Sequence, residues 1–422
     1  MIPEKSTLSN GIRVVLTPME ATEAVTAIVF AKAGSRCEDE KTNGLAHFQE
    51  HMFFKGGKKY NSAEAVAKAV DNIGAEINGG TSRQEVAYHI QCAGSQVEKA
   101  IDILSDMIIN APFDLAEINK ERSVIIQEIK RKLDNPGSQI WTDWQEIFFG
   151  NQPLGRAILG PVANIERFTK KNFVEYHARF YANGNIVISI AGKISSPHNT
   201  RLLLEKYFAS KPKKRAYEWK CFDKKLCAKP GTVSIRTQDT QQAHLILGFP
   251  SMHAKHELSS ASRILSIVLG GSMSSRLFLR IRGQQGLCYT VGIHNDRAVD
   301  AGFFATYAGV SPDKIEQAVK SILREFEKVL QKGITKKELK KGKNMLEGRF
   351  ALGLEDSPSV AEFFGNQELF YRKIETPRQV LDKIQAVTLE DVKRAADMIF
   401  SRKAVLTIIG PVDDKKRFQK LL

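Results

Sequence analysis

The sequence predicts an α+β fold built from two homologous repeats, each a mostly antiparallel sheet with helices packed on one face. Two observations support this class. Both halves contain short strands rich in β-branched residues, with amphipathic helices between them. A helix followed by an apolar strand also occurs twice, over residues 169–181 and 185–194 and again over residues 388–400 and 404–412. A long-range repeat of this kind indicates two halves that share one fold.

The repeat also predicts the domain boundaries. With 422 residues, the chain exceeds the roughly 250–300 residues at which single hydrophobic cores stop growing. We expect an N-terminal domain over residues 1–210 and a homologous C-terminal domain over residues 232–422. Residues 211–231 are charged and show no clear periodicity, which is typical of a linker.

Within the repeats, β-branched residues mark the strands, and apolar residues three and four positions apart mark the helices. In the first repeat we expect strands over 12–18, 24–34 and 85–93 and helices over 62–74 and 97–109. Ser62 is a suitable helix N-cap, and Gly74 a suitable helix end. The second repeat has the same pattern, with strands over 232–237, 243–250 and 302–310 and a helix over 259–271.

Composition excludes several classes of protein. Five scattered cysteines without a CxxC pair indicate reduced thiols, and therefore a cytoplasmic location, rather than a disulfide framework. No apolar stretch reaches the roughly 18 residues of a membrane span, and the first residues do not have the pattern of a signal peptide. The net charge of +15 is spread along the chain, so we expect no nucleic-acid and no membrane partner. A charge-driven binder of nucleic acid or membrane is the rival hypothesis.

The most informative stretch is GLAHFQEHMFFKG at residues 44–56, in which His47, Glu50 and His51 stand within five positions. Asn43 is a candidate N-cap and Gly56-Gly57 ends the segment, so we expect about three turns of helix. At ~100° per residue, both histidines and the glutamate share one face. The opposite face carries Leu45, Phe48 and Met52.

Two histidines at positions i and i+4 of a helix can direct ring nitrogens to one zinc ion at about 2.0–2.1 Å. The order His-x-x-Glu-His is the inverse of the commoner His-Glu-x-x-His, and in both motifs the glutamate lies beside the ion without binding it. A catalytic zinc site also needs a third protein ligand. The alternative interpretation is a partly exposed helix face with two unrelated histidines.

Candidates for the third ligand lie in the strongly helical stretch 117–136. Glu121 and Glu128 are seven residues apart, so both side chains point the same way from one helix. From these residues alone, two solvated surface carboxylates are the simpler interpretation.

These motifs resemble those of the pitrilysin-type metallopeptidases, and within them the mitochondrial processing peptidase and its bacterial relatives. The resemblance covers nearly the whole chain and rests on LSNGIRVVL, AGSRCEDEKTNGLAHFQEHMFFKG, PLGRAILG and MSSRLFLRIRGQQGLCYTV, in that order. In that family a glutamate follows the inverted motif, and another acid stands seven positions before it. Here 76 residues lie between His51 and Glu128, and Glu121 occupies the earlier position.

The resemblance implies a role for each of these residues. His47, His51 and Glu128 would hold one zinc ion per chain. Glu50 would be the general base that takes a proton from the zinc-activated water, and Glu121 would orient a ligand.

The resemblance also implies that Arg282 and Tyr289, in the C-terminal domain, form a pair that holds the substrate and its developing oxyanion. Without it, a surface arginine and a core tyrosine would be the simpler interpretation. EINGGTSRQEV at residues 76–86 is similar to the family's substrate strand, in which Asn78 and Gly79 would hold peptide backbone by β-augmentation. The alternative for this stretch is a glycine-rich turn.

The implied function is that of a zinc-dependent metalloendopeptidase, which hydrolyses unfolded peptides or presequence-like segments inside a clamshell chamber of two such subunits. Because one chain carries both the zinc motif and the Arg/Tyr pair, we expect a homodimer; a heterodimer with a related subunit and a monomer are the alternatives. The alternative function is that of a non-catalytic structural relative. Such relatives usually lose a histidine or the base glutamate, and this chain retains them.

Overall fold

The computed structural model describes residues 1–208 and 217–422. The chain forms two compact units, and each is assembled from three segments of the sequence. Unit 1 comprises Met1–Lys130, Arg156–Lys220 and Ala351–Pro377, and unit 2 comprises Arg131–Gly155, Cys221–Phe350 and Arg378–Leu422. Within the described residues, no helix is both long and apolar enough to cross a lipid bilayer.

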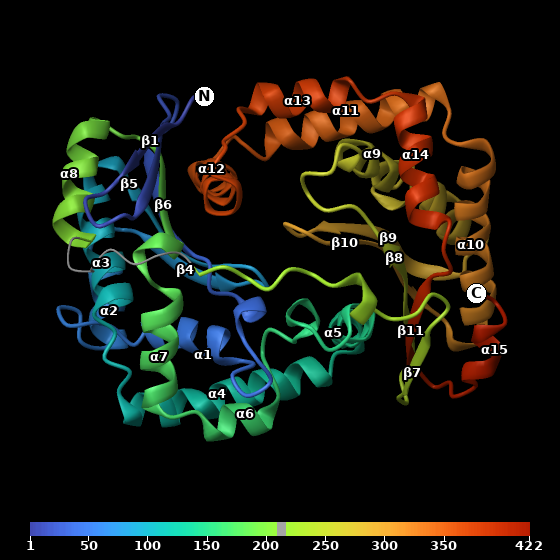
Figure 1. Ribbon diagram of the computed structural model, residues 1–422, viewed down its shortest axis with the longest axis horizontal. Helices are drawn as coiled ribbons and strands as arrows, with labels where there is room; N and C mark the ends of the chain where they lie inside the picture. Colours follow the sequence, from blue (N-terminus) through green and yellow to red (C-terminus); the bar gives the residue numbers. More distant parts are fainter. Residues whose placement is uncertain (209–216) are drawn as a thin grey trace. The chain divides into compact units, whose positions relative to one another are not determined.

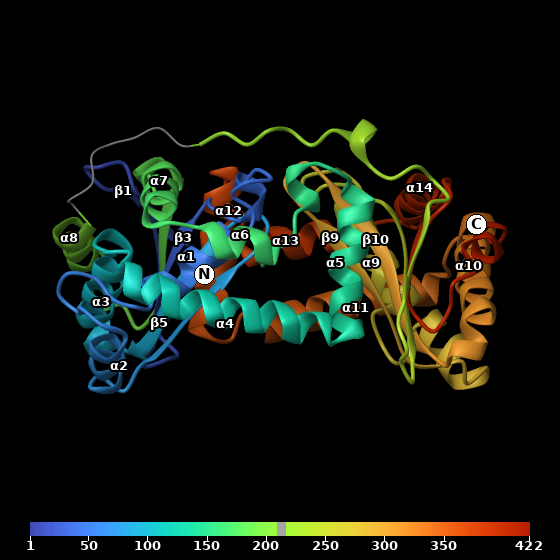
Figure 2. The same ribbon diagram turned by 90° about the horizontal axis from the view of Figure 1, so that it is seen from below.

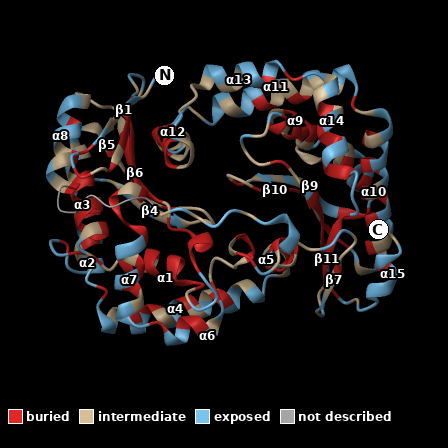
Figure 3. Cartoon of the chain, in the orientation of Figure 1, coloured by how far each residue is buried: buried red, intermediate tan, exposed pale blue. Residues whose placement is uncertain are grey.

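Unit 1 is built around a six-stranded sheet with the order β1-β2-β6-β3-β5-β4. Its strands are β1 (Glu4–Thr7), β2 (Arg13–Pro18), β3 (Ala24–Ala31), β4 (Glu76–Thr81), β5 (Val86–Ala93) and β6 (Ile186–Gly192). Strands β2 and β6 pair in parallel, and the other described pairs of this sheet are antiparallel. The central strand β6 is buried over its whole length (Figure 3) because both faces of the sheet are covered.

Unit 2 is built around a five-stranded sheet with the order β7-β11-β8-β10-β9. Its strands are β7 (Val233–Thr237), β8 (Ala243–Pro250), β9 (Cys288–Arg297), β10 (Gly302–Val310) and β11 (Val405–Gly410). The order matches that of unit 1 from β2 onward, including one parallel pair, β7 with β11, among the described strands. Thr169 and Thr388 also form capping boxes on the helices that precede the matching strands β6 and β11. The α+β class and the two-sheet repeat are therefore confirmed.

The helices that the sequence analysis predicts are present, and the structure adds others that it did not name. In unit 1 they are α1 (Leu45–Phe53), α2 (Ala63–Asp71), α3 (Val97–Ile109), α4 (Leu115–Leu133), α6 (Val162–Arg167), α7 (Lys170–Phe180), α8 (Pro197–Phe208) and α12 (Ser357–Tyr371). In unit 2 they are α5 (Pro136–Phe149), α9 (Ser259–Gly270), α10 (Ile315–Lys332), α11 (Lys336–Leu352), α13 (Pro377–Gln385), α14 (Leu389–Phe400) and α15 (Lys415–Gln419). Figure 2 shows α4, which carries the two candidate glutamates, as one continuous helix.

The two halves of the sequence exchange one helix each. Helix α12, from the second half, packs on β3 and β6 of unit 1 (Figure 1) and covers the face that carries Ile28 and Phe30. Helix α5, from the first half, packs on β8 and β11 of unit 2, where Trp144 is fully buried. The expectation placed helices on one face of each sheet; the exchanged helices cover the other face as well.

A glycine allows the close approach of each exchanged helix. In unit 1 a Cβ added at Gly365 of α12 would lie 2.3 Å from the ring of Phe30 on β3. In unit 2 a Cβ added at Gly248 of β8 would lie 2.3 Å from the ring of Trp144 on α5. In unit 1 the helix provides the glycine and the strand the aromatic ring, whereas in unit 2 the strand provides the glycine and the helix the ring. Both contacts are closely packed.

The exchange bears on the domain boundaries. Each compact unit contains a segment from the other half of the sequence, so the contiguous division into 1–210, 211–231 and 232–422 stays a prediction. Residues 211–216 of the expected linker lie outside the described residues. The remainder of that segment contains a short 3-10 helix over Lys224–Leu226.

Candidate metal centre

Helix α1 begins differently from the sequence-based expectation. Its N-cap is Gly44, with φ of 101°, and not Asn43. Glycine is favoured here because the backbone is in the left-handed region and an added Cβ would lie 2.7 Å from the carbonyl oxygen of Leu159. The Asn43 side chain instead donates hydrogen bonds to Glu38 and to the carbonyl oxygen of Ala157. The Asn43 prediction was wrong because another residue, five positions earlier in the sequence, caps this helix.

That residue is Glu38, whose carboxylate accepts three hydrogen bonds at the start of α1. The backbone N–H of Ala46 donates to Oε1 at 2.6 Å, and the backbone N–H of Gly44 donates to Oε2 at 3.0 Å. The third donor is the side-chain amide of Asn43, at 2.9 Å. Burial raises the pKa of Glu38 to about 7, although these hydrogen bonds favour the ionised form and by themselves would lower it. Glu38 therefore fixes the first turn of the helix that carries both histidines, and sequence periodicity contains no signal for it.

The two faces of α1 divide as predicted. Leu45, Phe48 and Met52 are buried in the core of unit 1, below the sheet face formed by alternate residues of β3. His47 and Glu50 are 8% and 9% exposed on the other face. Burial removes polar side chains from water, which is unfavourable unless they have hydrogen-bond partners or a ligand.

His47, His51 and Glu128 come together in unit 1. Glu128 Oε2 lies 3.6 Å from His47 Nε2 and 3.8 Å from His51 Nε2. One donor atom from each of the three residues lies within 4.8 Å of the others. Ligands of a tetrahedral zinc at ~2.0–2.1 Å stand about 3.3 Å apart, so this donor set and its spacing fit zinc with little adjustment. Among the residues that the structure describes, this is the group of three that could hold a metal.

Glu121 orients His51. Its Oε1 lies 2.9 Å from His51 Nδ1, while its Oε2 pairs with Lys55. Although burial favours the neutral acid, hydrogen bonds from His51 and Lys55 hold the pKa of Glu121 below its usual range. Burial alone would lower the pKa of His51, but Glu121, Glu50 and Glu128 outweigh that effect and raise it. With Nδ1 held by Glu121, the Nε2 atom of His51 faces Glu128.

Glu50 lies beside the three candidate ligands, and its carboxylate is held from another element. The hydroxyl of Thr81 at the end of β4 donates a hydrogen bond to Glu50 Oε2. Burial raises the pKa of Glu50, against the opposing effect of this hydrogen bond. Thr81 was not predicted as a site residue, although it stands directly after the stretch EINGG that was singled out.

The candidate substrate strand, β4, is an edge strand. It pairs with β5 on one side, with Asn78 opposite His89 and Gly79 opposite Tyr88, and has no other neighbour among the described strands. Residues 76–81 therefore form the expected strand, and the alternative of a glycine-rich turn is wrong for them. A Cβ added at Gly79 would lie 3.0 Å from the ring of Phe54, so a larger residue would disturb the packing between β4 and the end of α1.

Arg282 and Tyr289 lie together in unit 2. Arg282 belongs to a π-helical segment over Phe278–Gln284, and Tyr289 lies near the start of β9. The Arg282 guanidinium stands 5.2 Å from the centre of the Tyr289 ring. Tyr289 is 74% exposed, so the alternative of a core tyrosine is wrong. The pair presents a hydroxyl and a cation on the surface of this unit.

Comparisons with known proteins agree with this site. Residues 13–162 match the family model described as insulinase (peptidase family M16), and residues 167–346 match the model described as peptidase M16 inactive domain. An uncharacterized zinc protease of Bacillus subtilis is 33% identical over 97% of this chain and 98% of its own length. Another, of Rickettsia felis, is 32% identical over 97% of both chains.

Two solved structures share the fold. A protease from Helicobacter pylori has a TM-score of 0.88 and 24% identity over 97% of this chain and 99% of its own. A peptidase M16 inactive domain from Pseudomonas fluorescens has a TM-score of 0.90 and 19% identity over 98% and 99%. A two-unit α+β fold with an inverted zinc motif defines a class of metallopeptidase. The chain belongs to peptidase family M16, and its relatives in Bacillus subtilis and Rickettsia felis are named zinc proteases.

Proposed function

We propose that the chain is a zinc-dependent metalloendopeptidase that hydrolyses unfolded peptides or presequence-like segments, as the processing-peptidase branch of the family does. One observation carries the proposal. His47, His51 and Glu128 present three donor atoms within 4.8 Å of one another, next to a buried glutamate that has no place among these donors. This is the arrangement that a catalytic zinc with an open fourth position requires.

Each residue then has one task. His47, His51 and Glu128 would hold zinc, which would supply the Lewis acidity that activates a water molecule. Glu50 accepts a proton at its carboxylate and delivers it to the leaving amine, and a pKa raised by burial suits it to both steps. Thr81 holds Oε2 of Glu50.

The position of the base also connects the site to the peptide. Thr81 ends the edge strand β4, so the residue that holds the base continues the strand proposed to bind substrate. An extended peptide paired along Asn78 and Gly79 by backbone hydrogen bonds would run toward Glu50. A strand that binds through backbone groups selects unfolded segments and tolerates many sequences.

We further propose that the chain acts in the cytoplasm as a homodimer that encloses peptides in a clamshell chamber, with a heterodimer with a related subunit as the alternative. The exposed hydroxyl of Tyr289, with Arg282 beside it, is suited to hold the oxyanion of a substrate bound to the partner subunit. Size and subunit composition in solution test this arrangement directly.

The competing proposal is a non-catalytic relative. The family model that covers residues 167–346 is described as an inactive domain, and no comparable donor group is found in the described part of that range. The zinc motif, however, lies in the segment that matches the insulinase model and retains its base. The two proposals therefore differ in whether this one site turns over.

The test is cleavage of a library of unstructured peptides, followed by mass spectrometry, for wild type and Glu50→Gln. The substitution keeps the side-chain volume and the three ligands, so both proteins should bind one zinc per chain while only wild type cuts. Glu64→Gln is the matched control because it removes an exposed carboxylate from α2 of the same unit. If zinc-loaded wild type does not cut, alone or mixed with a related subunit, the non-catalytic proposal replaces this one.

A further inference from the structure

Arg282, one member of the Arg/Tyr pair, is held by aromatic rings and not by hydrogen bonds. Its guanidinium carbon lies 4.8 Å from the centre of the Phe278 ring and 5.2 Å from the centre of the Tyr289 ring. Within the described residues, this guanidinium forms neither an ion pair nor a hydrogen bond. Its five N–H donors therefore stay available to a ligand.

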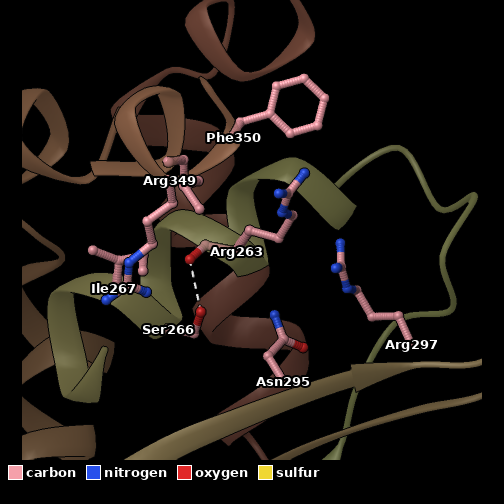
Figure 4. Close-up of a pocket in the computed structure, with 8 residues that line it drawn as sticks. Arg263, Ser266, Ile267, Asn295, Arg297, Arg349 and Phe350 are labelled. Carbon is pink, nitrogen blue, oxygen red and sulfur yellow. Dashed lines mark hydrogen bonds between the residues drawn. The ribbon is translucent and has the colours of Figure 1, made fainter. Parts of the chain in front are cut away.

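Other arginines of unit 2 are held differently. Figure 4 shows two of them beside a pocket of about 310 Å³ among α9, β9 and α11. Arg297 donates a hydrogen bond to the hydroxyl of Ser259 at 3.2 Å, and Arg349 donates to the carbonyl oxygen of Gly271. Such bonds fix a guanidinium but occupy some of its donors. A ring face orients the guanidinium plane through cation–π attraction and leaves the donors at its edge unoccupied.

The Phe278 ring is a firm support. It is half-buried and packs against the core of unit 2, in which Ile281 of the same π-helical segment is fully buried. Just beyond this segment, the hydroxyl of Ser321 on α10 donates a hydrogen bond to the side-chain oxygen of Gln285 at 2.8 Å. The segment is thus fixed on its buried side, while Arg282 is exposed. π-Helical turns are rare and occur frequently at functional sites.

We propose that Phe278 is a positioning residue for peptide binding, because its ring fixes the plane of the Arg282 guanidinium with the N–H donors free for substrate oxygens. Phe278 itself does not contact the peptide. The same guanidinium joins its ring to Tyr289, so Phe278 supports both members of the pair. A side chain that is already ordered loses less conformational entropy when it binds a ligand. The inference rests on the function proposed above, in which this pair holds the substrate.

The test is a double-mutant cycle on peptide affinity, measured by fluorescence anisotropy in zinc-loaded full chains that all carry Glu50→Gln, so that no peptide is cut. The probe is the fluorescein-labelled library of unstructured peptides. We expect Phe278→Leu to weaken binding about two- to fivefold, the factor that corresponds to about 0.5–1 kcal/mol for an exposed cation–π contact. In a chain that also carries Arg282→Gln, the same change should leave affinity unaltered, because the group that Phe278 positions is absent.

Two further variants separate positioning from a loss of stability. Phe278→Tyr keeps the ring face and should bind peptides as tightly as the parent chain. Phe326→Leu makes the matched change in a buried ring of the same core, which packs on Phe249 and Phe400. It should lower the midpoint of thermal unfolding without changing peptide affinity.

A spectroscopic measurement tests the stack itself and needs no substrate. Protons that lie over the face of an aromatic ring are shifted upfield by its ring current. In nuclear magnetic resonance spectra of arginine-labelled chains, the Hδ and Hε signals of Arg282, assigned with Arg282→Gln, should therefore lie upfield in wild type and in Phe278→Tyr. They should move back toward unperturbed positions in Phe278→Leu.

Three results would overturn the proposal: an equal effect of Phe278→Leu with and without Arg282, a loss in Phe278→Tyr as large as in Phe278→Leu, or Arg282 signals that Phe278→Leu leaves in place. Absence of peptide binding by the Glu50→Gln chain would overturn it as well. Failure of the peptidase proposal is a separate observation, in which zinc-loaded wild type binds the library and cuts none of it.

Discussion

Replacing Glu121 by glutamine should weaken zinc binding without removing a zinc ligand. The carboxylate is 7% exposed and serves two partners, with Oε1 at 2.9 Å from His51 Nδ1 and Oε2 paired with Lys55. A glutamine of the same shape has one acceptor oxygen and one donor nitrogen. Its oxygen can accept a hydrogen bond from His51 or from Lys55 but not from both. The other donor would then face the amide nitrogen, which is itself a donor.

The magnitude follows from these contacts. Partners that orient a metal-bound histidine are typically worth about 10–100-fold in metal affinity, which corresponds to roughly 1.4–2.8 kcal/mol. We expect Glu121→Gln to fall inside that range, because the hydrogen bond to His51 is short and buried while one acceptor is retained. Removing a ligand, as in His51→Ala, should cost far more.

Zinc affinity is best measured by competition with a chromogenic chelator, with denaturant unfolding of each apoprotein as a check on the fold. Glu117→Gln is the matched control, since Glu117 lies one turn earlier on α4 and pairs with Lys120 near the surface. Wild-type affinity in Glu121→Gln would refute the argument that this hydrogen bond orients His51. A loss as large as that of His51→Ala would show instead that Glu121 binds the metal itself.

Three further predictions concern the fold. Gly365→Ala should destabilise the chain by about 1–3 kcal/mol in urea unfolding, because its Cβ would lie 2.3 Å from the Phe30 ring, whereas Gly348→Ala, with open space around it, should not. Burial raises the pKa of Glu38 from 4.5 to about 7, so the folded state holds this proton more tightly than the unfolded state. The free energy of unfolding should therefore fall as pH rises through this interval, by at most about 3 kcal/mol. Glu38→Gln should remove that pH dependence. Residues 1–210 expressed alone lack α12 and should bind the dye ANS more strongly than the full chain.

Each of these has a clear contrary result. Equal stability of Gly365→Ala and wild type would mean that α12 does not pack tightly on β3. A wild-type pH profile that matches that of Glu38→Gln would place the carboxyl in a more polar site than its burial indicates. Weak dye binding by the isolated segment would show that its sheet face finds another cover.

What could be predicted from the sequence was local. The strand over Val86–Ala93 follows from alternation, because one of its faces is buried and the other is not. The helical repeat likewise groups His47, Glu50 and His51, since one turn of one helix places them together. Wherever a single element contains the whole pattern, periodicity is sufficient.

The residues that complete the site come from other elements, and periodicity contains no information about them. Glu128 could be selected over a solvated surface role only through the family resemblance, because α1 and α4 meet by tertiary packing. Glu38 and Thr81 reach the site from a turn and from a strand end, where no regular spacing marks them. Asn43 was an incorrect N-cap because the N-cap rule considers side chains at the helix start itself, whereas the carboxylate that caps α1 belongs to Glu38, five positions before Asn43.

The exchanged helix extends this reasoning to the stability of the metal centre. Helices α1 and α12 lie on opposite faces of the unit 1 sheet, because α1 belongs to the core that includes Val29 and α12 to the core that includes Phe30. Ser357 and Ala361 of α12 also make hydrogen bonds to β3 and β6 through the sheet's buried hydroxyl groups. The sheet that supports the zinc motif is therefore covered by residues from the second half of the chain. Substitutions in α12 should weaken zinc binding through the stability of the sheet, although α12 provides none of the donor atoms.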